Sequence, residues 1–162
     1  GNGFIGAECV DYLMTHNPTF EFVLLNRGNW KEWDTEKRIR ARVKESIVYD
    51  RRKDSLEKCL KHYLNDDDLK FKAIIDFSAY KSSDIASTLD AIPANKIGLY
   101  IYISTDSVYE VCVDKKEETK SNQESSDQDI RLLSESDAIR PESREEREKL
   151  KEFDSYGHHK LK

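Results

Sequence analysis

Residues 97–107, IGLYIYISTDS, form an apolar run that ends abruptly in a row of hydroxyl and carboxyl groups. The apolar part, 97–103, predicts a strand buried on both faces, because it lacks the alternation of a half-exposed strand. Residues 71–80, FKAIIDFSAY, follow the same pattern and also end in small polar residues. Two such runs predict a parallel sheet with helices on both of its faces.

The rest of the chain alternates helical and strand patterns around these two runs. Apolar residues at helical spacing predict a helix over 6–16, and β-rich runs predict strands over 20–25 and 46–50. Further helices are expected over 54–64 and 83–92. The resulting order (helix, strand, strand, helix, strand, helix, strand) is typical of a doubly wound α/β fold. Such folds bind ligands at the carboxyl ends of their strands, where the polar clusters of this chain lie.

The charge is distributed unevenly along the 162 residues. Residues 114–154 hold fourteen acidic and nine basic residues, whereas the rest of the chain has eighteen of each. No net basic segment results, which disfavours a nucleic-acid partner. The three cysteines lack CxxC spacing, and no apolar run reaches the length of a membrane span. We therefore expect a soluble, cytoplasmic protein with no membrane partner.

The last third of the chain changes character. Residues 114–150 are polar and poor in apolar residues, which predicts an acidic, flexible insert. Residues 140–162, RPESREEREKLKEFDSYGHHKLK, predict a helix with charged pairs on its exposed face. His158 and His159 are adjacent, and adjacent side chains diverge on a helix, so we expect no metal site.

A glycine-rich stretch, GNGFIG at 1–6, opens the first predicted helix. Glycines remove side-chain bulk, so that a pyrophosphate can approach the N–H groups at a helix start, although a tight turn explains the same residues. A dinucleotide fold also needs a ribose-binding residue about twenty positions later. Asn26 and Arg27 lie twenty and twenty-one residues after Gly6. An arginine without an acidic residue suits the 2′-phosphate of NADP, and a surface arginine in a turn is the alternative.

The sequence YGHHK, 156–160, places Tyr156 and Lys160 on one face of a helix. A nearby ammonium group and the positive nicotinamide of an oxidised cofactor lower the pKa of a phenol from about 10 toward neutrality. Such a phenol acts as a general acid and base at neutral pH. The Tyr-Lys spacing is common by itself. It gains weight from the glycine turn, the Asn-Arg pair and the strand that ends at Thr105.

This combination resembles the extended short-chain dehydrogenase/reductase family, the nucleotide-sugar epimerases and dehydratases, over nearly the whole chain. The resemblance implies one NAD(P)-binding, Rossmann-like domain over residues 1–162, incomplete at both ends. The first strand and the C-terminal substrate region are then expected outside this sequence. A small-molecule substrate and a homodimer of the full-length protein are further expectations.

The resemblance also assigns residues to the cofactor. GNGFIG is similar to the latter part of the family's glycine turn, which implies that Gly3, Phe4, Ile5 and Gly6 lie at the pyrophosphate. YDRR and DFSAYK resemble the phrases after the family's third and fourth strands. Together with the Asn-Arg pair, they imply these further cofactor contacts: Asn26, Arg27, Asp50, Arg51, Phe77, Ser78, Ala79 and Lys81.

The catalytic set implied by the resemblance is Thr105, Tyr156 and Lys160, of which the last two also contact the cofactor. In dehydratases of this family an Asp and a Glu follow the threonine. Here Asp106 is kept, but Ser107 replaces the Glu, which argues against dehydratase chemistry. The distance along the sequence from Thr105 to Tyr156 is also longer than the family pattern, because of the acidic insert.

Three functions stay open at this point. The first is an NAD(P)-dependent, epimerase/dehydratase-like oxidoreductase that acts on a carbinol of a nucleotide-sugar-like substrate. The second is an NADPH-dependent carbonyl reductase of the same fold, which Arg27 favours. The third is a non-catalytic cofactor-binding, regulatory or nucleic-acid-associated relative. The electrically neutral remainder of the chain and the Thr–Tyr–Lys set argue against this third function.

Overall fold

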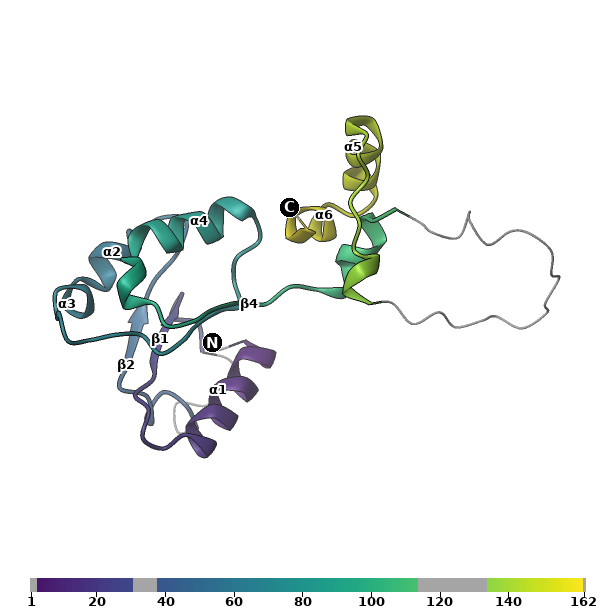
Figure 1. Cartoon of the computed structure of the whole chain (residues 1–162). Coiled ribbons are helices and arrows are strands. Elements are labelled where there is room, and N and C mark those ends of the chain that lie inside the picture. The colour runs from purple at the N-terminus through teal and green to yellow at the C-terminus, as the bar shows by residue number, and fades with distance from the viewer. Residues whose placement is uncertain (1–2, 31–37, 114–133, 162) are drawn as a thin grey trace. The chain divides into compact units, whose positions relative to one another are not determined.

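The structure, a computed structural model, describes residues 3–30, 38–113 and 134–161 (Figure 1). The chain divides into two compact units. Unit 1 comprises Gly1–Phe77 and Ser87–Ile101, and unit 2 comprises Ser78–Ala86 and Tyr102–Lys162. The residues assigned to the cofactor and to catalysis are therefore divided between two units.

Unit 1 begins with a helix and two strands. Helix α1 spans Phe4–His16, and its buried residues recur at helical spacing on one face. Strands β1 (Val23–Asn26) and β2 (Glu45–Val48) pair in parallel, with Asn26 opposite Val48 at their carboxyl ends. The helix and the two strands expected in this part of the sequence are confirmed.

The later elements follow the predicted order. Helices α2 (Leu56–Cys59) and α3 (Lys61–Leu64) precede strand β3 (Ile74–Asp76), and helix α4 (Ser82–Ala91) follows it. A 3₁₀ turn, η1 (Ala94–Lys96), then leads into strand β4 (Tyr100–Tyr102). Strand β3 pairs with β4, and the bridge between Phe71 and Ile97 that precedes them is parallel. The expected α/β class is confirmed.

Three elements are shorter than the sequence predicts. The helix expected over 54–64 is divided at Leu60, and the strands expected over 71–80 and 97–103 retain three residues each. The two runs are also less buried than expected, since all three residues of β4 are half-buried and Leu99 before it is 55% exposed. Strand length depends on a hydrogen-bonded neighbour. Among the described residues the strands form two separate two-stranded sheets. Their union in one doubly wound sheet stays a prediction.

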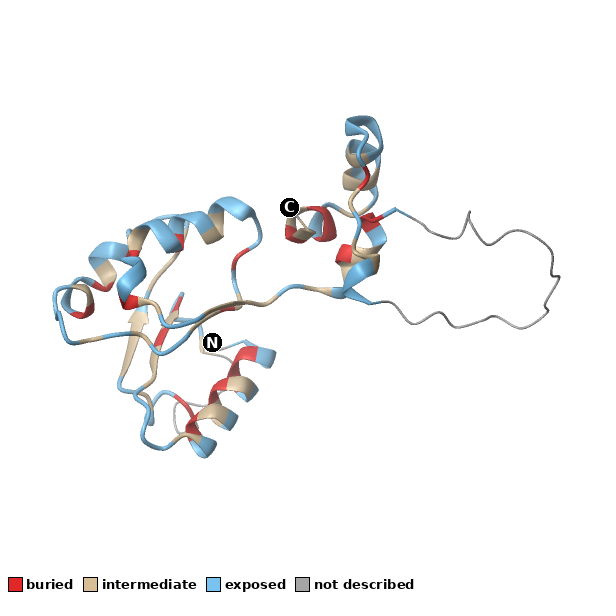
Figure 2. Ribbon diagram, in the orientation of Figure 1, coloured by how far each residue is buried: buried red, intermediate tan, exposed pale blue. Residues whose placement is uncertain are grey.

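The core of unit 1 lies on both sides of β1. On one side, Leu24 packs with the buried face of α1 and with Ile39, which is fully buried. On the other side, Val23 and Leu25 pack against a second cluster built by α2, α3 and the end of α4. Figure 2 shows the buried stripe along α1. Because successive side chains of a strand point to opposite faces, β1 is covered by helices on both sides.

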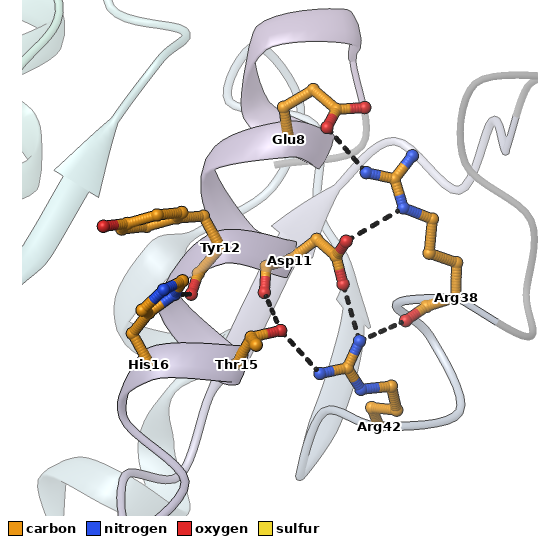
Figure 3. Close-up of polar contacts among 7 residues, drawn as sticks. All are labelled: Glu8, Asp11, Tyr12, Thr15, His16, Arg38 and Arg42. Atoms are coloured by element: carbon orange, nitrogen blue, oxygen red, sulfur yellow. Dashed lines mark hydrogen bonds and ion pairs between the residues drawn. The ribbon is translucent and has the colours of Figure 1, made fainter.

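A cluster of ion pairs fastens the turn after residue 37 to the outer face of α1 (Figure 3). Arg38 Nη2 lies 2.7 Å from Glu8 Oε2, and its Nε lies 3.2 Å from Asp11 Oδ2. Arg42 Nη1 reaches the other oxygen of Asp11 at 2.6 Å. Burial raises the pKa of Asp11, but its hydrogen bonds to the two arginines outweigh this effect and hold the pKa below its usual range. We call these four residues the α1 clasp.

Unit 2 contains the 3₁₀ helices η2 (Asp106–Val111) and η4 (Glu135–Asp137) and the helices α5 (Arg144–Phe153) and α6 (Ser155–Leu161). Helix α6 packs against both η2 and α5. The backbone N–H of Val113 donates to the carbonyl of Ile139 at 2.8 Å. The expected flexible insert lies largely in residues 114–133, outside the described residues.

The prediction of a single helix over 140–162 is wrong, because the helix is interrupted at Asp154. The backbone of Asp154 is extended, with φ −136° and ψ 94°. Its carboxylate Oδ1 accepts the N–H groups of Tyr156 and Gly157 at 2.9 and 3.1 Å. A short acidic side chain that satisfies the first N–H groups of a helix favours a new helix start over continuation. Asp154 therefore begins α6 and fixes its direction.

Candidate functional site

The glycine turn opens α1 as expected. Gly3 occupies the N-cap position of the helix, without a side-chain cap. A Cβ built on Gly3 would meet nothing within 4 Å, and Phe4 and Ile5 are each 66% exposed. A helix leaves the N–H groups of its first turn without partners inside the helix. The open start of α1 can therefore receive an anionic group, whereas Gly6 is buried against the core.

At the end of β1, the buried side-chain amide of Asn26 is followed by the exposed Arg27. Asn26 is 8% exposed, and its Oδ1 accepts the N–H of Gly28 at 2.8 Å. Gly28 has a φ of +80°, a backbone conformation that residues other than glycine rarely adopt. Within the described chain, the buried Asn26 Nδ2 has no hydrogen-bond partner. Arg27, between them, is exposed. This strand end offers a donor and a positive charge to a polar ligand.

The end of β2 is tied to the end of β3 by a buried ion pair. Arg51 Nη2 lies 2.6 Å from Asp76 Oδ2, and the side chain of Asp76 is 5% exposed. Tyr100 donates its hydroxyl to the same carboxylate oxygen at 2.8 Å. Burial raises the pKa of Tyr100, and the hydrogen bond to Asp76 raises it further. Arg51 therefore holds strand ends together.

Asp50, the neighbour of Arg51, organises the turn after β2. Its Oδ1 accepts the N–H of Arg52 at 3.0 Å, while its own N–H donates to Asp54 Oδ2 at 2.6 Å. These contacts occupy backbone groups of the turn and leave the Asp50 carboxylate partly exposed. The sequence expects Asp50 and Arg51 together near the adenine. Their contacts differ, because Arg51 points into a buried network and Asp50 into a surface turn.

The segment after β3, residues 77–81, is held by a hydrogen bond to its backbone. Phe77 lies at the end of the strand in unit 1, and Ser78, Ala79 and Lys81 belong to unit 2. Ala79 is fully buried, and its carbonyl accepts a hydrogen bond from Lys160 Nζ at 2.7 Å. Ser78 and Lys81 are exposed. This segment is therefore fixed by its backbone and presents polar side chains outward.

Thr105 lies where the strand expected over 97–103 gives way to η2. Its Oγ1 accepts the N–H of Ser107 at 3.3 Å and donates to Asp106 Oδ1 at 3.1 Å. The threonine thus caps η2, and its half-buried side chain is oriented by its own local contacts. Asp106 is exposed beside it.

Tyr156 and Lys160 lie one turn apart on α6, as the spacing predicts. Lys160 is 8% exposed, and its ammonium donates to the carbonyls of Ala79 and Ile103 at 2.7 and 2.8 Å. Its Nζ also lies 5.7 Å from the centroid of the Tyr156 ring. The ring of Tyr156 is 38% exposed. The lysine thus links α6 to the segments that follow β3 and β4, next to a tyrosine that solvent can reach.

Gly157 allows α6 to approach η2 closely. A Cβ built on this residue would lie 2.1 Å from the carbonyl oxygen of Ser107. No side chain fits at that distance, so only glycine permits the contact. The two residues join the candidate hydroxyl segment, 105–107, to the helix that carries Tyr156 and Lys160. The sequence identifies Tyr156 and Lys160 but not the requirement for glycine between them.

Tyr80 is a residue that sequence reasoning misses. Its ring lies edge-to-face on Tyr156, with centroids 5.3 Å apart and planes at 61°. Lys160 Nζ lies 5.5 Å from the Tyr80 centroid and 4.5 Å from that of Tyr102. The only available signal is the position of Tyr80 within FSAYK, between two residues assigned to the cofactor.

Within unit 2, the contacts join Ala79, Thr105, Tyr156 and Lys160 through α6 and η2. In unit 1, the ends of β1 and β2 meet at Asn26, whose carbonyl accepts the N–H of Tyr49 at 2.8 Å. The described residues contain no cluster of three or more His, Cys, Asp or Glu side chains suited to a metal ion. No described helix has both the length and the apolar character needed to cross a membrane.

Comparison with known proteins adds no family to these observations. No family model, curated protein sequence or solved structure matches the chain. The functional conclusions therefore depend on the residues and their geometry alone.

Proposed function

We propose that the protein is an NAD(P)-dependent oxidoreductase that acts on a carbinol, in the manner of the extended short-chain dehydrogenases/reductases. The observation that carries the proposal is the packing of α6 in unit 2. Tyr156 and Lys160 lie one turn apart, and the lysine is anchored to the carbonyls of Ala79 and Ile103. The same helix contacts the segment that carries Thr105. Three residue types suited to carbinol chemistry thus belong to one packed unit.

Unit 1 supplies features that fit a dinucleotide. The open space around Gly3 at the start of α1 suits a pyrophosphate, since the helix dipole favours an anion there. The buried Nδ2 of Asn26 offers a donor to a ribose oxygen, and the exposed Arg27 offers a positive charge to a 2′-phosphate. We therefore propose NADP as the preferred form. Helices on both sides of β1 support a doubly wound sheet as the framework.

The proposed chemistry assigns one role to each catalytic residue. When bound, the nicotinamide supplies a site that accepts a hydride from carbon. Tyr156 takes the hydroxyl proton of the carbinol, and the Thr105 hydroxyl orients the same oxygen by turning its single proton from Asp106 toward the substrate. Lys160 places a positive charge 5.7 Å from the centroid of the Tyr156 ring.

Ser107 affects the choice among reactions of this class. A dehydratase needs an acid and a base after the threonine, and Ser107 stands where the base is expected. The backbone of Ser107 instead contacts Gly157, so this position serves the packing of α6. We therefore favour an epimerase or a carbonyl reductase over a dehydratase. The exposed Arg27 is the observation that favours an NADPH-dependent reductase as the second candidate.

Titration of the full-length protein with NADH and NADPH, followed by nicotinamide fluorescence, tests the cofactor. We expect binding of NADPH that weakens in Arg27→Ala and is unchanged in the charge-matched control Arg40→Ala, whose guanidinium lies over Trp30. A preference for NADH in the unaltered protein would contradict the role of Arg27. Binding of neither nucleotide would refute the proposed function.

The catalytic role is tested by the Tyr156→Phe variant, which removes one hydroxyl and keeps the ring that packs on Tyr80. We expect nucleotide binding to persist while conversion of carbinol or carbonyl substrates is lost. Tyr12→Phe, at an exposed tyrosine of α1, serves as the matched control. Full activity of Tyr156→Phe would exclude the tyrosine as the acid and base.

A further inference from the structure

Tyr80 belongs to a tyrosine cage around the Lys160 ammonium, which we define as Tyr80, Tyr102 and Tyr156. The three ring centroids lie 5.5, 4.5 and 5.7 Å from Lys160 Nζ. Aromatic rings attract a cation through their electron-rich faces, and more strongly where water is excluded. Lys160 is 8% exposed, whereas Tyr80 is 54% exposed. The outer wall of the cage is thus the ring of Tyr80, which is in contact with solvent.

The backbone that carries Tyr80 is fixed on both sides of the residue. On one side, the carbonyl of Ala79 accepts the Lys160 ammonium at 2.7 Å. On the other, Asp84 Oδ2 accepts the N–H groups of Tyr80 and Lys81 at 2.8 and 3.0 Å. Asp84 lies in the first turn of α4, so the start of that helix holds the backbone that carries the ring. Tyr80 is therefore held in place by its own backbone, independently of its ring contacts.

The ring of Tyr80 contacts the ring of Tyr156. The two rings meet edge-to-face at 5.3 Å, the arrangement that aromatic pairs prefer. Tyr156 lies in the first turn of α6, and its side chain is partly exposed, so its ring needs a neighbour to restrict its rotamers. Tyr80 is a neighbour on a different segment of unit 2, fixed by other contacts.

We infer that Tyr80 is a positioning residue for the Tyr156–Lys160 pair: its ring fixes the orientation of the Tyr156 phenol and shields the Lys160 ammonium from water. The inference rests on the proposed function, in which these two residues handle the proton of a carbinol. Tyr80 itself touches no reacting atom. It acts through the ring of Tyr156 and through the environment of one charge.

Two variants separate the ring of Tyr80 from its hydroxyl. Tyr80→Phe keeps the edge-to-face contact and one wall of the cage, whereas Tyr80→Leu removes both and keeps an apolar side chain. Tyr12→Leu is the matched control, since Tyr12 is an exposed tyrosine of unit 1 that stacks on His16. All variants are made in the full chain, and thermal unfolding checks that each one folds.

The first readout is the NMR spectrum of protein labelled with ring-¹³C tyrosine, in which the Tyr156 signal is the one lost in Tyr156→Phe. Tyr80→Leu is expected to shift and broaden this signal, because a ring current and a rotamer restraint are both removed. Tyr80→Phe and Tyr12→Leu are expected to leave it in place. A Tyr156 signal unchanged in Tyr80→Leu would overturn the inference.

The second readout is the rate at which sulfosuccinimidyl acetate acetylates Lys160, followed by peptide mass spectrometry. We expect a several-fold rise in Tyr80→Leu, rescue to the original rate in Tyr80→Phe, and no change at the exposed Lys149. An unchanged Lys160 rate in Tyr80→Leu would show that the ring does not shield the ammonium. A faster Lys160 rate accompanied by a lower unfolding temperature of Tyr80→Leu would indicate general loosening of the unit, and that result would also count against the inference.

Titration with NADPH distinguishes the failure of this inference from that of the proposed function. A protein that binds neither NADPH nor NADH refutes the function, whatever the two readouts give. A protein that binds nucleotide but shows no change at Tyr156 or Lys160 in Tyr80→Leu refutes the role of Tyr80 alone. We expect NADPH still to bind to Tyr80→Leu, because the contacts proposed for the pyrophosphate and the ribose lie in unit 1, which the variant does not change.

Discussion

Units 1 and 2 each hold a largely covered cation against a segment that follows a strand, but they stabilise it in different ways. In unit 1, the guanidinium of Arg51 meets the carboxylate of Asp76 at 2.6 Å. In unit 2, the ammonium of Lys160 meets the carbonyls of Ala79 and Ile103 and the rings of the tyrosine cage. A carboxylate cancels the field of its partner, whereas carbonyl dipoles and rings stabilise a cation and carry no net charge themselves.

The two cations therefore suit different roles. The Arg51–Asp76 pair suits a structural role, because it links the segment after β2 to the end of β3 and its two opposite charges cancel. The Lys160 ammonium suits a chemical role, because dipoles that hold a charge leave its field to act on a neighbouring phenol.

Removal of Asp76 tests the structural role of the unit 1 pair. Asp76→Ala leaves the Arg51 guanidinium buried without its carboxylate, and we expect a loss of about 3–5 kcal/mol in the free energy of unfolding. Urea unfolding measures it. The double variant Arg51→Met/Asp76→Leu is the control and is expected to recover most of the loss, because no buried charge is left. A fully stable Asp76→Ala would show that the pair does not tie the strand ends.

Gly157→Ala tests the close approach on which the unit 2 arrangement depends. The new Cβ would overlap the Ser107 carbonyl, so we expect α6 to shift and the protein to lose about 1–3 kcal/mol. Urea unfolding gives the loss, and hydrogen exchange of the α6 amides locates it. Gly3→Ala is the control at a glycine with open space around it and is expected to lose less. Equal losses in both variants would argue against a special contact at Gly157.

His158 predicts a pH dependence of stability. It is buried, and its Nε2 accepts a hydrogen bond from Arg140 Nη2 at 3.2 Å, which requires a neutral ring. Burial lowers the pKa of His158, and the charges of Arg140 and His159 lower it further. An unfolded histidine binds its proton near pH 6.5, before the folded one does, so stability is expected to fall as pH drops from about 7.5 to 5.5.

Urea midpoints measured across this pH range check the prediction. His158→Gln is expected to flatten the slope, because it removes the group that the unfolded state protonates first. His62→Gln, at a histidine whose side chain is 59% exposed, is the matched control and is expected to keep the slope. A slope that survives in His158→Gln would assign the pH dependence to another group.

The α1 clasp is expected to give the smallest effect. Its arginines and Glu8 lie at the surface, where water and salt weaken ion pairs. Asp11→Asn removes the charge that both arginines share, and we expect a small drop in the urea midpoint that shrinks further at high salt. Glu145→Gln, in an isolated pair on α5, is the control and is expected to lose less than the shared site. A large, salt-independent loss would show that the clasp is part of the core.

The sequence predicts the order of elements in unit 1, because that order depends on local patterns. Alternating helical and strand periods locate α1, β1, β2, β3, α4 and β4, and the four-residue spacing puts Tyr156 and Lys160 on one face of α6. The break at Asp154 is missed, since an acidic residue in a charged helix looks like any other until its carboxylate is seen to cap two N–H groups.

Local patterns in the sequence are enough to predict the α/β class, the residue types that follow the strands and the pairing of a tyrosine with a lysine on one helix. The contacts that those residues make come from the folded chain. It gives Arg51 a buried carboxylate, closes Gly157 on the Ser107 carbonyl, and brings Tyr80 to a ring 76 residues later in the chain. The reason is physical. Periodicity fixes which residues share a face of one element, whereas contacts between distant segments depend on the path of the whole backbone.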